Sequence, residues 1–165
     1  MVPYNIKQVL VLRLKYPDGK GGFTKLRTGK LCSQASHGSM KVFFDRSNLR
    51  SSNKFIKIVG GLVNWVVSLV TGQKQVVMIT FLTPEMAEWV SGTFAKVVLA
   101  VDTEEELLEL YKQAQDAGLP CALIEDVGNT EFHGVVTRTV LSCGPAASED
   151  LDKIFRGGTV KTRLA

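Results

Sequence analysis

The sequence predicts an α/β protein in which helices pack on a single sheet. The chain has 165 residues, which suits one domain, and 45% of them are apolar, which allows a sizeable core. Apolar runs typical of strands alternate with segments of helical periodicity. We therefore expect one domain over residues 1–165, organised as an α/β sandwich.

In the first half, residues 7–15 (KQVLVLRLK) predict a strand, and residues 17–22 predict a turn. A helical pattern follows from residue 28 to about residue 44. Between residues 55 and 70, apolar residues recur at steps of three and four, and more lie on the opposite side: Ile56, Val59, Leu62, Val63, Trp65, Val66, Leu69 and Val70. This second helix is predicted to be deeply buried or part of a subunit interface.

The second half shows the alternation most clearly. Thr103 and Glu106 form a capping-box pattern at the start of one helix. In chain order, we expect a strand or extended segment over 75–82, a short helix over 85–90, a strand over 96–101, a helix over 103–117, strands over 121–125 and 139–142, a helix over 148–155, and a last strand within 159–164.

Composition excludes several classes of protein. The net charge of +4 and the pI near 9.0 permit a polyanionic partner without requiring one. Cys32, Cys121 and Cys143 are odd in number and widely spaced, so we expect small buried thiols in a reducing compartment rather than a disulfide framework or zinc knuckle.

Targeting signals are not apparent in the sequence. The N-terminal residues do not resemble a signal peptide. The apolar stretch 55–70 has 16 residues, contains Lys57 and Asn64, and falls short of the ~20 apolar residues that a membrane span needs. We expect a cytoplasmic protein without a membrane partner.

The first place where chemistry is expected is the start of the helix at residues 28–30. Free backbone N–H groups and the helix dipole favour anions there, and Lys30 strengthens that preference. Gln34, His37 and Lys41 follow Lys30 at steps that place all four on one helical face. The alternative interpretation is a solvated polar stripe.

The second place is the loop 126–130, at the carboxyl end of a predicted strand, where ligands of α/β proteins gather. Asp126 is followed by Gly128 and Asn129, which suit a tight turn, and by the hydroxyl of Thr130. The alternative interpretation is that Asp126 only caps this turn.

Other catalytic motifs are missing. Gly29-Lys30 lacks the first glycine and the final Ser or Thr of a P-loop, and the sequence contains neither a G-x-S-x-G elbow nor a G-x-G-x-x-G motif after the first strand. His37 and His133 have no metal-ligand spacing, so no metal site is expected.

Four sequence blocks resemble the type II peptidyl-tRNA hydrolases. They are KQVLVLRL at 7–14, GKLCSQASHG at 29–38, GLPCALIEDVGNT at 118–130 and TVLSCGP at 139–145. The resemblance implies a three-layer α/β/α sandwich with a central mixed sheet of about four strands, frequent dimerisation and no cofactor. It also implies hydrolysis of the ester between a peptide and tRNA, which recycles stalled peptidyl-tRNA and rescues ribosomes.

The same resemblance assigns residues. It implies a catalytic set of Lys30, Asp126, Thr130 and Thr139, with Gln34 and His37 nearby as substrate-binding residues. We expect the basic residues Lys25, Arg27 and Arg138 to bind substrate as well. We expect Asp126 to orient or deprotonate water and Lys30 to stabilise an oxyanion or hold the terminal phosphate. Candidate tRNA contacts are Arg13, Lys15, Lys20, Lys25, Arg27, Lys41, Lys161 and Arg163.

The chain departs from the family pattern in three ways that lower positive charge near the expected site. Thr28 and Asn129 replace basic residues, and Glu131 stands where Gln is common; Lys25, Arg27 or Arg138 is expected to compensate. The segment at about 45–88 is a longer insertion.

Three other functions remain open at this stage. They are a non-catalytic tRNA- or protein-binding module, an esterase or deacylase for another acyl substrate, and a structural homodimer built through residues 55–70.

Overall fold

A computed structural model describes residues 5–50, 52–73 and 76–165. The chain divides into two compact units, Met1–Val42 with Pro84–Ala165, and Phe43–Thr83. The elements are β1 (Ile6–Arg13), β2 (Tyr16–Pro17), β3 (Phe23–Thr24), α1 (Thr28–Phe44), α2 (Lys54–Thr71), α3 (Pro84–Ser91), β4 (Lys96–Val101), α4 (Glu104–Asp116), β5 (Cys121–Asp126), β6 (Thr137–Ala147), α5 (Ser148–Phe155) and β7 (Arg163–Leu164).

The first unit is built on a mixed sheet in the order β5-β6-β1-β4-β7. Strands β1 and β4 are parallel, and the other neighbours are antiparallel. The predicted fold class is confirmed, with five strands because the short β7 adds to the four longer ones. A separate hairpin, β2-β3, follows β1.

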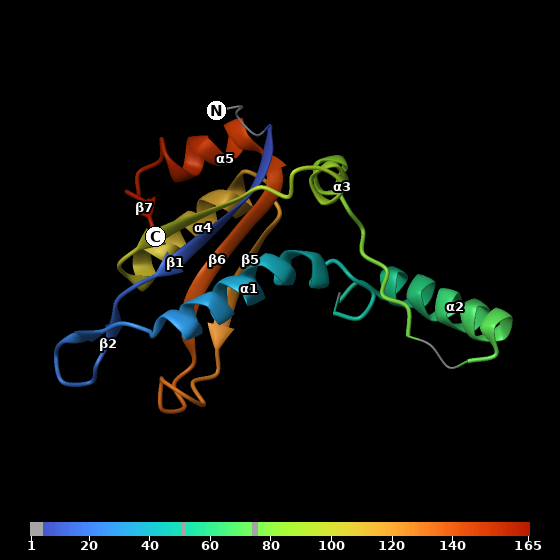
Figure 1. Ribbon diagram of the computed structural model, residues 1–165, viewed down its shortest axis with the longest axis horizontal. Coiled ribbons are helices and arrows are strands. Elements are labelled where there is room, and N and C mark those ends of the chain that lie inside the picture. Colours follow the sequence, from blue (N-terminus) through green and yellow to red (C-terminus); the bar gives the residue numbers. More distant parts are fainter. Residues whose placement is uncertain (1–4, 51, 74–75) are drawn as a thin grey trace. The chain divides into compact units, whose positions relative to one another are not determined.

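Helices cover both faces of this sheet (Figure 1). Alternate residues of β1 point to opposite faces, so Val9 and Val11 join the core under α4 and α5, while Leu12 joins the smaller core under α1. Helix α1 lies so close to β6 at Gly38 that a Cβ added there would come within 3.0 Å of Val140 Cγ1. This close approach brings the first turns of α1 near the end of β5.

Local sequence signals explain where the helices begin. The capping box of α4 forms as predicted, with the Thr103 hydroxyl accepting from the N–H of Glu106 and the Glu106 carboxylate accepting from the N–H of Thr103. Helix α1 has the predicted bounds, and α3 begins at Pro84, whose fixed φ suits a first helical turn.

The second unit consists of α2 and two irregular segments that pack on one side of it. Gly60 of α2 packs against Asn48 so closely that a Cβ added to Gly60 would come within 2.1 Å of the Asn48 amide nitrogen. Asn48 also binds the backbone of Val77 and Ile79. The Asn64 side chain accepts a hydrogen bond from the N–H of Val77 at 2.5 Å.

The structure narrows two expectations and corrects a third. Helix α2 is not deeply buried, since only 6% of its residues are buried, so the first of its two predicted roles is excluded. Of the strand or extended segment expected over 75–82, the described residues 76–82 form no strand, only an isolated bridge from Thr80 to Ser47; Gln75 lies outside the described residues. Cys32 is exposed rather than buried, whereas Cys143 is buried and Cys121 is partly buried; all three are free thiols.

Candidate active site

Asp126 ends β5 and begins a tight turn. The N–H of Gly128 donates to Asp126 Oδ1 at 2.8 Å, so the carboxylate caps the turn as the simpler interpretation expected. Gly128 has a φ of +84°, and a Cβ there would lie 2.7 Å from the Val135 carbonyl oxygen. Only glycine fits this position without displacing the backbone.

The same carboxylate is also the centre of a charged cluster. From the first turns of α1, Lys30 Nζ forms an ion pair with Asp126 Oδ2, and Gln34 Nε2 donates to this oxygen at 2.6 Å. The spacing of four residues places both side chains on one helical face. Gln34 is 3% exposed, so the alternative of a wholly solvated stripe is wrong for this residue.

A buried threonine fixes the amide of Gln34. The Thr139 hydroxyl, on the central part of β6, donates to Gln34 Oε1 at 2.8 Å and lies 3.4 Å from the Ile124 carbonyl oxygen. Because the amide oxygen accepts from Thr139, its nitrogen is the atom directed at Asp126. Thr139 is fully buried, so its contact with the cluster runs through Gln34.

Electrostatics keep Asp126 ionised. Burial is the largest single influence on this carboxyl and acts to raise its pKa. The hydrogen bond and charge of Lys30, together with the N–H of Gly128 and the Gln34 amide, act in the opposite direction and outweigh it, so the pKa is lowered from 3.8. Asp126 is therefore an anion at neutral pH and a weak proton acceptor.

Of the other predicted site residues, some contact this cluster and others do not. Thr130 joins it, since Lys30 Nζ donates to the Thr130 hydroxyl at 3.3 Å. His37 is exposed and contacts Ser33 at 3.4 Å, rather than the carboxylate. Lys25 is exposed, with no ion pair among the described residues.

The two arginines expected to compensate for missing positive charge are already paired with acidic side chains. Arg27 forms an ion pair with Glu131 at 2.8 Å. Arg138 pairs with Glu104 at 2.8 Å and Glu125 at 3.1 Å, and the Glu104 contact is the main reason that its pKa is raised. Of the three residues expected to compensate, only Lys25 has no acidic partner among those that the structure describes.

The set of candidate tRNA contacts also changes. Arg13 is 5% exposed, pairs with Glu104 and lies over the Tyr16 ring, so it is not available as a surface contact. Lys15 and Arg163 both pair with Asp102. Lys20, Lys25 and Lys161 are exposed.

In the described part of the chain, no cluster of three or more His, Cys, Asp or Glu residues suits a metal ion.

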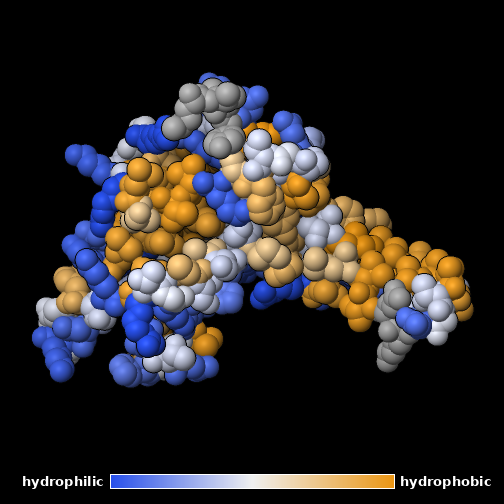
Figure 2. Space-filling model, viewed as in Figure 1, coloured by the Kyte–Doolittle hydropathy of each residue, from blue (hydrophilic) through white to orange (hydrophobic). Residues whose placement is uncertain are grey.

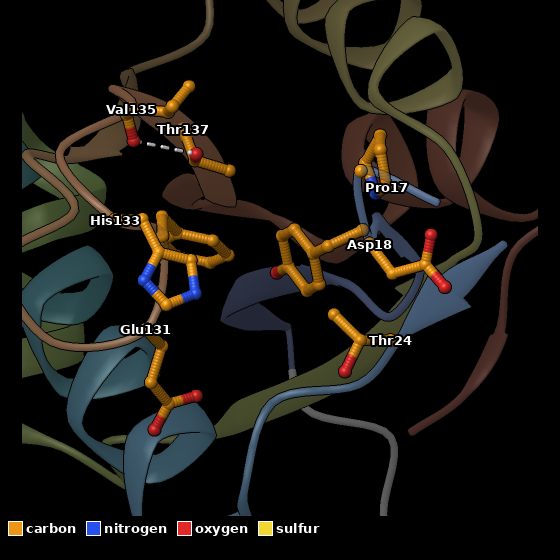
Figure 3. A pocket seen from close by; sticks show the side chains of 10 residues that line it. Pro17, Asp18, Thr24, Glu131, His133, Val135 and Thr137 are labelled. Carbon is orange, nitrogen blue, oxygen red and sulfur yellow. Dashed lines mark hydrogen bonds between the residues drawn. The ribbon is translucent and has the colours of Figure 1, made fainter. Parts of the chain in front are cut away.

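A pocket of about 560 Å³ lies beside the strand β6, at the end that pairs with Asp126 (Figure 3). Its walls come from residues 16–24 and 131–137 and include Tyr16, Asp18, Glu131, Val135 and Thr137. Thr137 is the strand partner of Asp126. Burial chiefly raises the pKa of Tyr16; the charge of Arg13 opposes this, and the charge of Asp126 adds to it.

Sequence reasoning missed this pocket. Its walls come from segments more than a hundred residues apart, and each segment by itself has only the composition of a loop. The one local signal is Phe132, an aromatic residue within a turn-rich segment, whose ring lies 5.0 Å from that of Tyr16.

Thr139→Val tests the buried link to Gln34. The substitution leaves the amide oxygen of Gln34 without its donor, which costs about 1–3 kcal/mol of stability. Gln34 is then free to turn away from Asp126. For the hydrolysis of peptidyl-tRNA that the resemblance implies, we expect kcat to fall roughly tenfold with little change in KM. Thr139→Ser keeps the hydroxyl and should restore kcat. If the serine variant is as slow as the valine variant, the hydroxyl does not position Gln34.

Comparison with known proteins finds similar sequences that match most of this chain. The family model described as Peptidyl-tRNA hydrolase PTH2 matches residues 6–158. A peptidyl-tRNA hydrolase of Methanocaldococcus jannaschii is 40% identical over 151 residues, covering 90% of this chain and 94% of its own. One from Methanococcus maripaludis is 32% identical over 132 residues, covering 80% and 85%. A probable peptidyl-tRNA hydrolase 2 of Drosophila melanogaster is 28% identical, covering 91% of this chain and 59% of its own.

Proposed function

Because this chain belongs to the peptidyl-tRNA hydrolase PTH2 family, we propose that it hydrolyses the ester bond between a peptide, or an N-blocked amino acid, and tRNA. The observation that carries the proposal is the Lys30–Asp126 pair at the carboxyl end of β5, held by Gln34, with a pocket beside the end of β6 that pairs with Asp126. A non-catalytic module on the same fold is not favoured, since the named relatives are hydrolases.

Asp126 is assigned to holding the attacking water. Its two oxygens offer about four acceptor positions. Lys30, Gln34 and the Gly128 N–H occupy three of these, which leaves one on Oδ1 for a water molecule. Since the pKa of this carboxyl is lowered, Asp126 orients the water more than it deprotonates it before attack.

Lys30 is assigned to the developing negative charge. As the water oxygen bonds to the ester carbonyl carbon, the carbonyl oxygen becomes an oxyanion, and the ammonium group stabilises it. The carbonyl then re-forms as the bond to the ribose oxygen breaks, and this oxygen takes up the proton that the attacking water gives up, so that the products are the free carboxylic acid of the peptide and free tRNA. Thr130, which contacts Lys30 Nζ, positions substrate or water, and Thr139 acts through Gln34.

The pocket is assigned to the acylated end of the substrate. Most of its surface is apolar and Asp18 in its wall would repel a phosphate, so an amino-acid side chain suits it better than the tRNA backbone. The tRNA backbone is then left to exposed basic residues such as Lys20 and Lys25.

Val135→Trp tests this assignment of the pocket. Val135 lines the pocket and is 64% exposed, so a tryptophan can fill part of the space. We expect KM for N-blocked aminoacyl-tRNA with a bulky side chain to rise about tenfold or more, while kcat changes little. Val136→Trp is the matched control, because Val136 is equally exposed at 63% but does not line the pocket. Equal effects of the two variants would refute the assignment.

The proposed reaction is tested by release of N-blocked amino acid from a charged tRNA, measured with the purified chain and with the Asp126 and Lys30 variants described in the Discussion. Rapid release that depends on both residues supports the hydrolase. Turnover of other acyl esters at equal efficiency would instead favour a general esterase. Tight tRNA binding without any release would favour the binding module.

The cellular setting is part of the proposal. Three free thiols are typical of a reducing compartment, which supports a cytoplasmic location. The family of the chain supports a role in ribosome rescue. A homodimer stays a prediction.

A further inference from the structure

Helix α2 carries an exposed apolar stripe. Large apolar side chains recur along it at steps of three and four, so they share one face, and each is exposed: Phe55, Ile58, Leu62, Trp65 and Leu69. Val66 and Val70 extend this stripe, and Trp65 is 61% exposed. Figure 2 shows hydrophobic residues dominating the visible face of the second unit. Contiguous apolar surface of this kind marks an interaction site.

The second unit itself leaves this face uncovered. Its irregular segments pack on the other side of α2, through Gly60 against Asn48 and through the contact of Asn64 with Val77. The side of α2 that carries Gly60 and Asn64 is therefore used inside the unit, whereas its largest apolar side chains are left on the opposite, exposed side. A helix whose large apolar side chains are exposed differs from one that packs onto a core, where those side chains are buried.

Positive charge is concentrated in the same unit. Residues 43–83 contain five basic residues and one acidic residue, a net charge of +4, which equals the net charge of the entire chain. No acidic residue follows Asp45 before residue 84. Lys54 and Lys57 are exposed in the first turn of α2, where the helix dipole disfavours cations, so helix stability does not explain them.

We propose that the second unit docks on an anionic membrane surface through α2. The apolar stripe enters the boundary between headgroups and acyl chains, and Lys54 and Lys57 meet the lipid headgroups. An apolar helix face combined with an excess of positive charge is the pattern of an interfacial helix. This docking goes beyond the proposed hydrolysis and brings the enzyme to a surface.

The helix lies in the membrane plane rather than crossing it. With 18 residues and a mean hydropathy of 1.4, α2 is long and apolar enough to cross a bilayer. However, both ends of the second unit join the same first unit, so a crossing helix would require the chain to cross back. The described residues between α2 and α3 form no helix or strand, and irregular backbone is not stable within lipid.

Two other occupants fit the observations less well. A second copy would bring two units of charge +4 together, whereas an anionic surface neutralises that charge. A tRNA would neutralise the charge but leave the apolar stripe of α2 in water.

The test uses the complete chain with phosphatidylcholine vesicles, with and without phosphatidylserine. We expect co-sedimentation with the anionic vesicles and a blue shift of tryptophan emission. Trp65 is the reporter, because Trp89 is already buried; Trp65→Phe should abolish the shift and keep the binding. Lys54→Glu with Lys57→Glu should weaken binding by at least ~25-fold, about fivefold for each lysine.

The matched control is Lys112→Glu with Lys153→Glu, which changes the net charge equally on α4 and α5 and should bind as wild type does. Hydrolysis without vesicles should be unchanged in both double variants, which shows that the first unit is folded. The proposal is overturned by any of three results: no binding to anionic vesicles, a vesicle-free dimer that shifts Trp65 emission, or charge reversal that weakens only tRNA binding.

Discussion

Asp126→Asn is expected to lower kcat/KM for N-blocked aminoacyl-tRNA roughly 100- to 1,000-fold. Asparagine has nearly the same shape but no charge, and its amide nitrogen is a donor that would face either Lys30 and Gln34 or, in the other orientation, the N–H of Gly128. Both the site for the water and the partner of Lys30 are lost together. The measurement is single-turnover release of the blocked amino acid.

Glu125→Gln is the matched control for this variant. It neutralises the preceding carboxylate on the same strand, which pairs with Arg138 rather than with Lys30, and we expect activity within about twofold of wild type. An Asp126→Asn protein that unfolds at the same denaturant concentration as wild type and retains near-normal turnover would remove Asp126 from the mechanism.

The same variant gives a pH test. The pKa of Asp126 is lowered in the folded chain from 3.8, so its carboxylate contributes stability above that value and loses it as the pH falls through the lower folded pKa. The stability difference between wild type and Asp126→Asn should therefore be constant from neutral pH to about pH 5 and shrink below about pH 4. A difference that already declines between pH 7 and pH 5 would mean that the pKa is not lowered.

Lys30→Met is expected to lower kcat roughly 100- to 1,000-fold, the usual cost of losing one group that stabilises an oxyanion. Methionine keeps the apolar stem but removes the ammonium, and Asp126 loses the charge that lowers its pKa. The effect should lie mainly in kcat, because the oxyanion exists only in the transition state.

Two further variants separate charge from geometry at Lys30. Lys112→Met removes an equal charge from the exposed surface of α4 and should leave kcat unchanged. Lys30→Arg keeps the charge with a different shape and should recover only part of the activity. A Lys30→Met protein with normal kcat and a raised KM would instead make Lys30 a phosphate-binding residue.

Much of the fold follows from the sequence, because periodicity and capping are local signals. The bounds of α1, the capping box at Thr103 and the strand before Asp126 were all predicted from neighbours within a few residues. Lys30 and Asp126 were each identified by their place at the end of an element. Their pairing was implied only by resemblance to a family.

Tertiary structure alone decided what these residues meet. Gln34 looked like part of a solvated stripe, yet it is buried because α1 lies against β6 at Gly38. Arg138 looked available for substrate, yet two acidic residues from other elements neutralise it. The pocket is formed by two loops distant in the chain, and no local pattern encodes that contact.

Helix α2 shows most plainly which properties follow from the sequence and which are decided by the tertiary structure. Its sequence determined that it is a helix and that it is apolar, since both properties depend on spacing and composition. Whether such a helix is buried depends on which surfaces the rest of the chain presents to it, which is a long-range property. The structure leaves its apolar face exposed, because the asparagines of this unit hold the neighbouring segments on the opposite side.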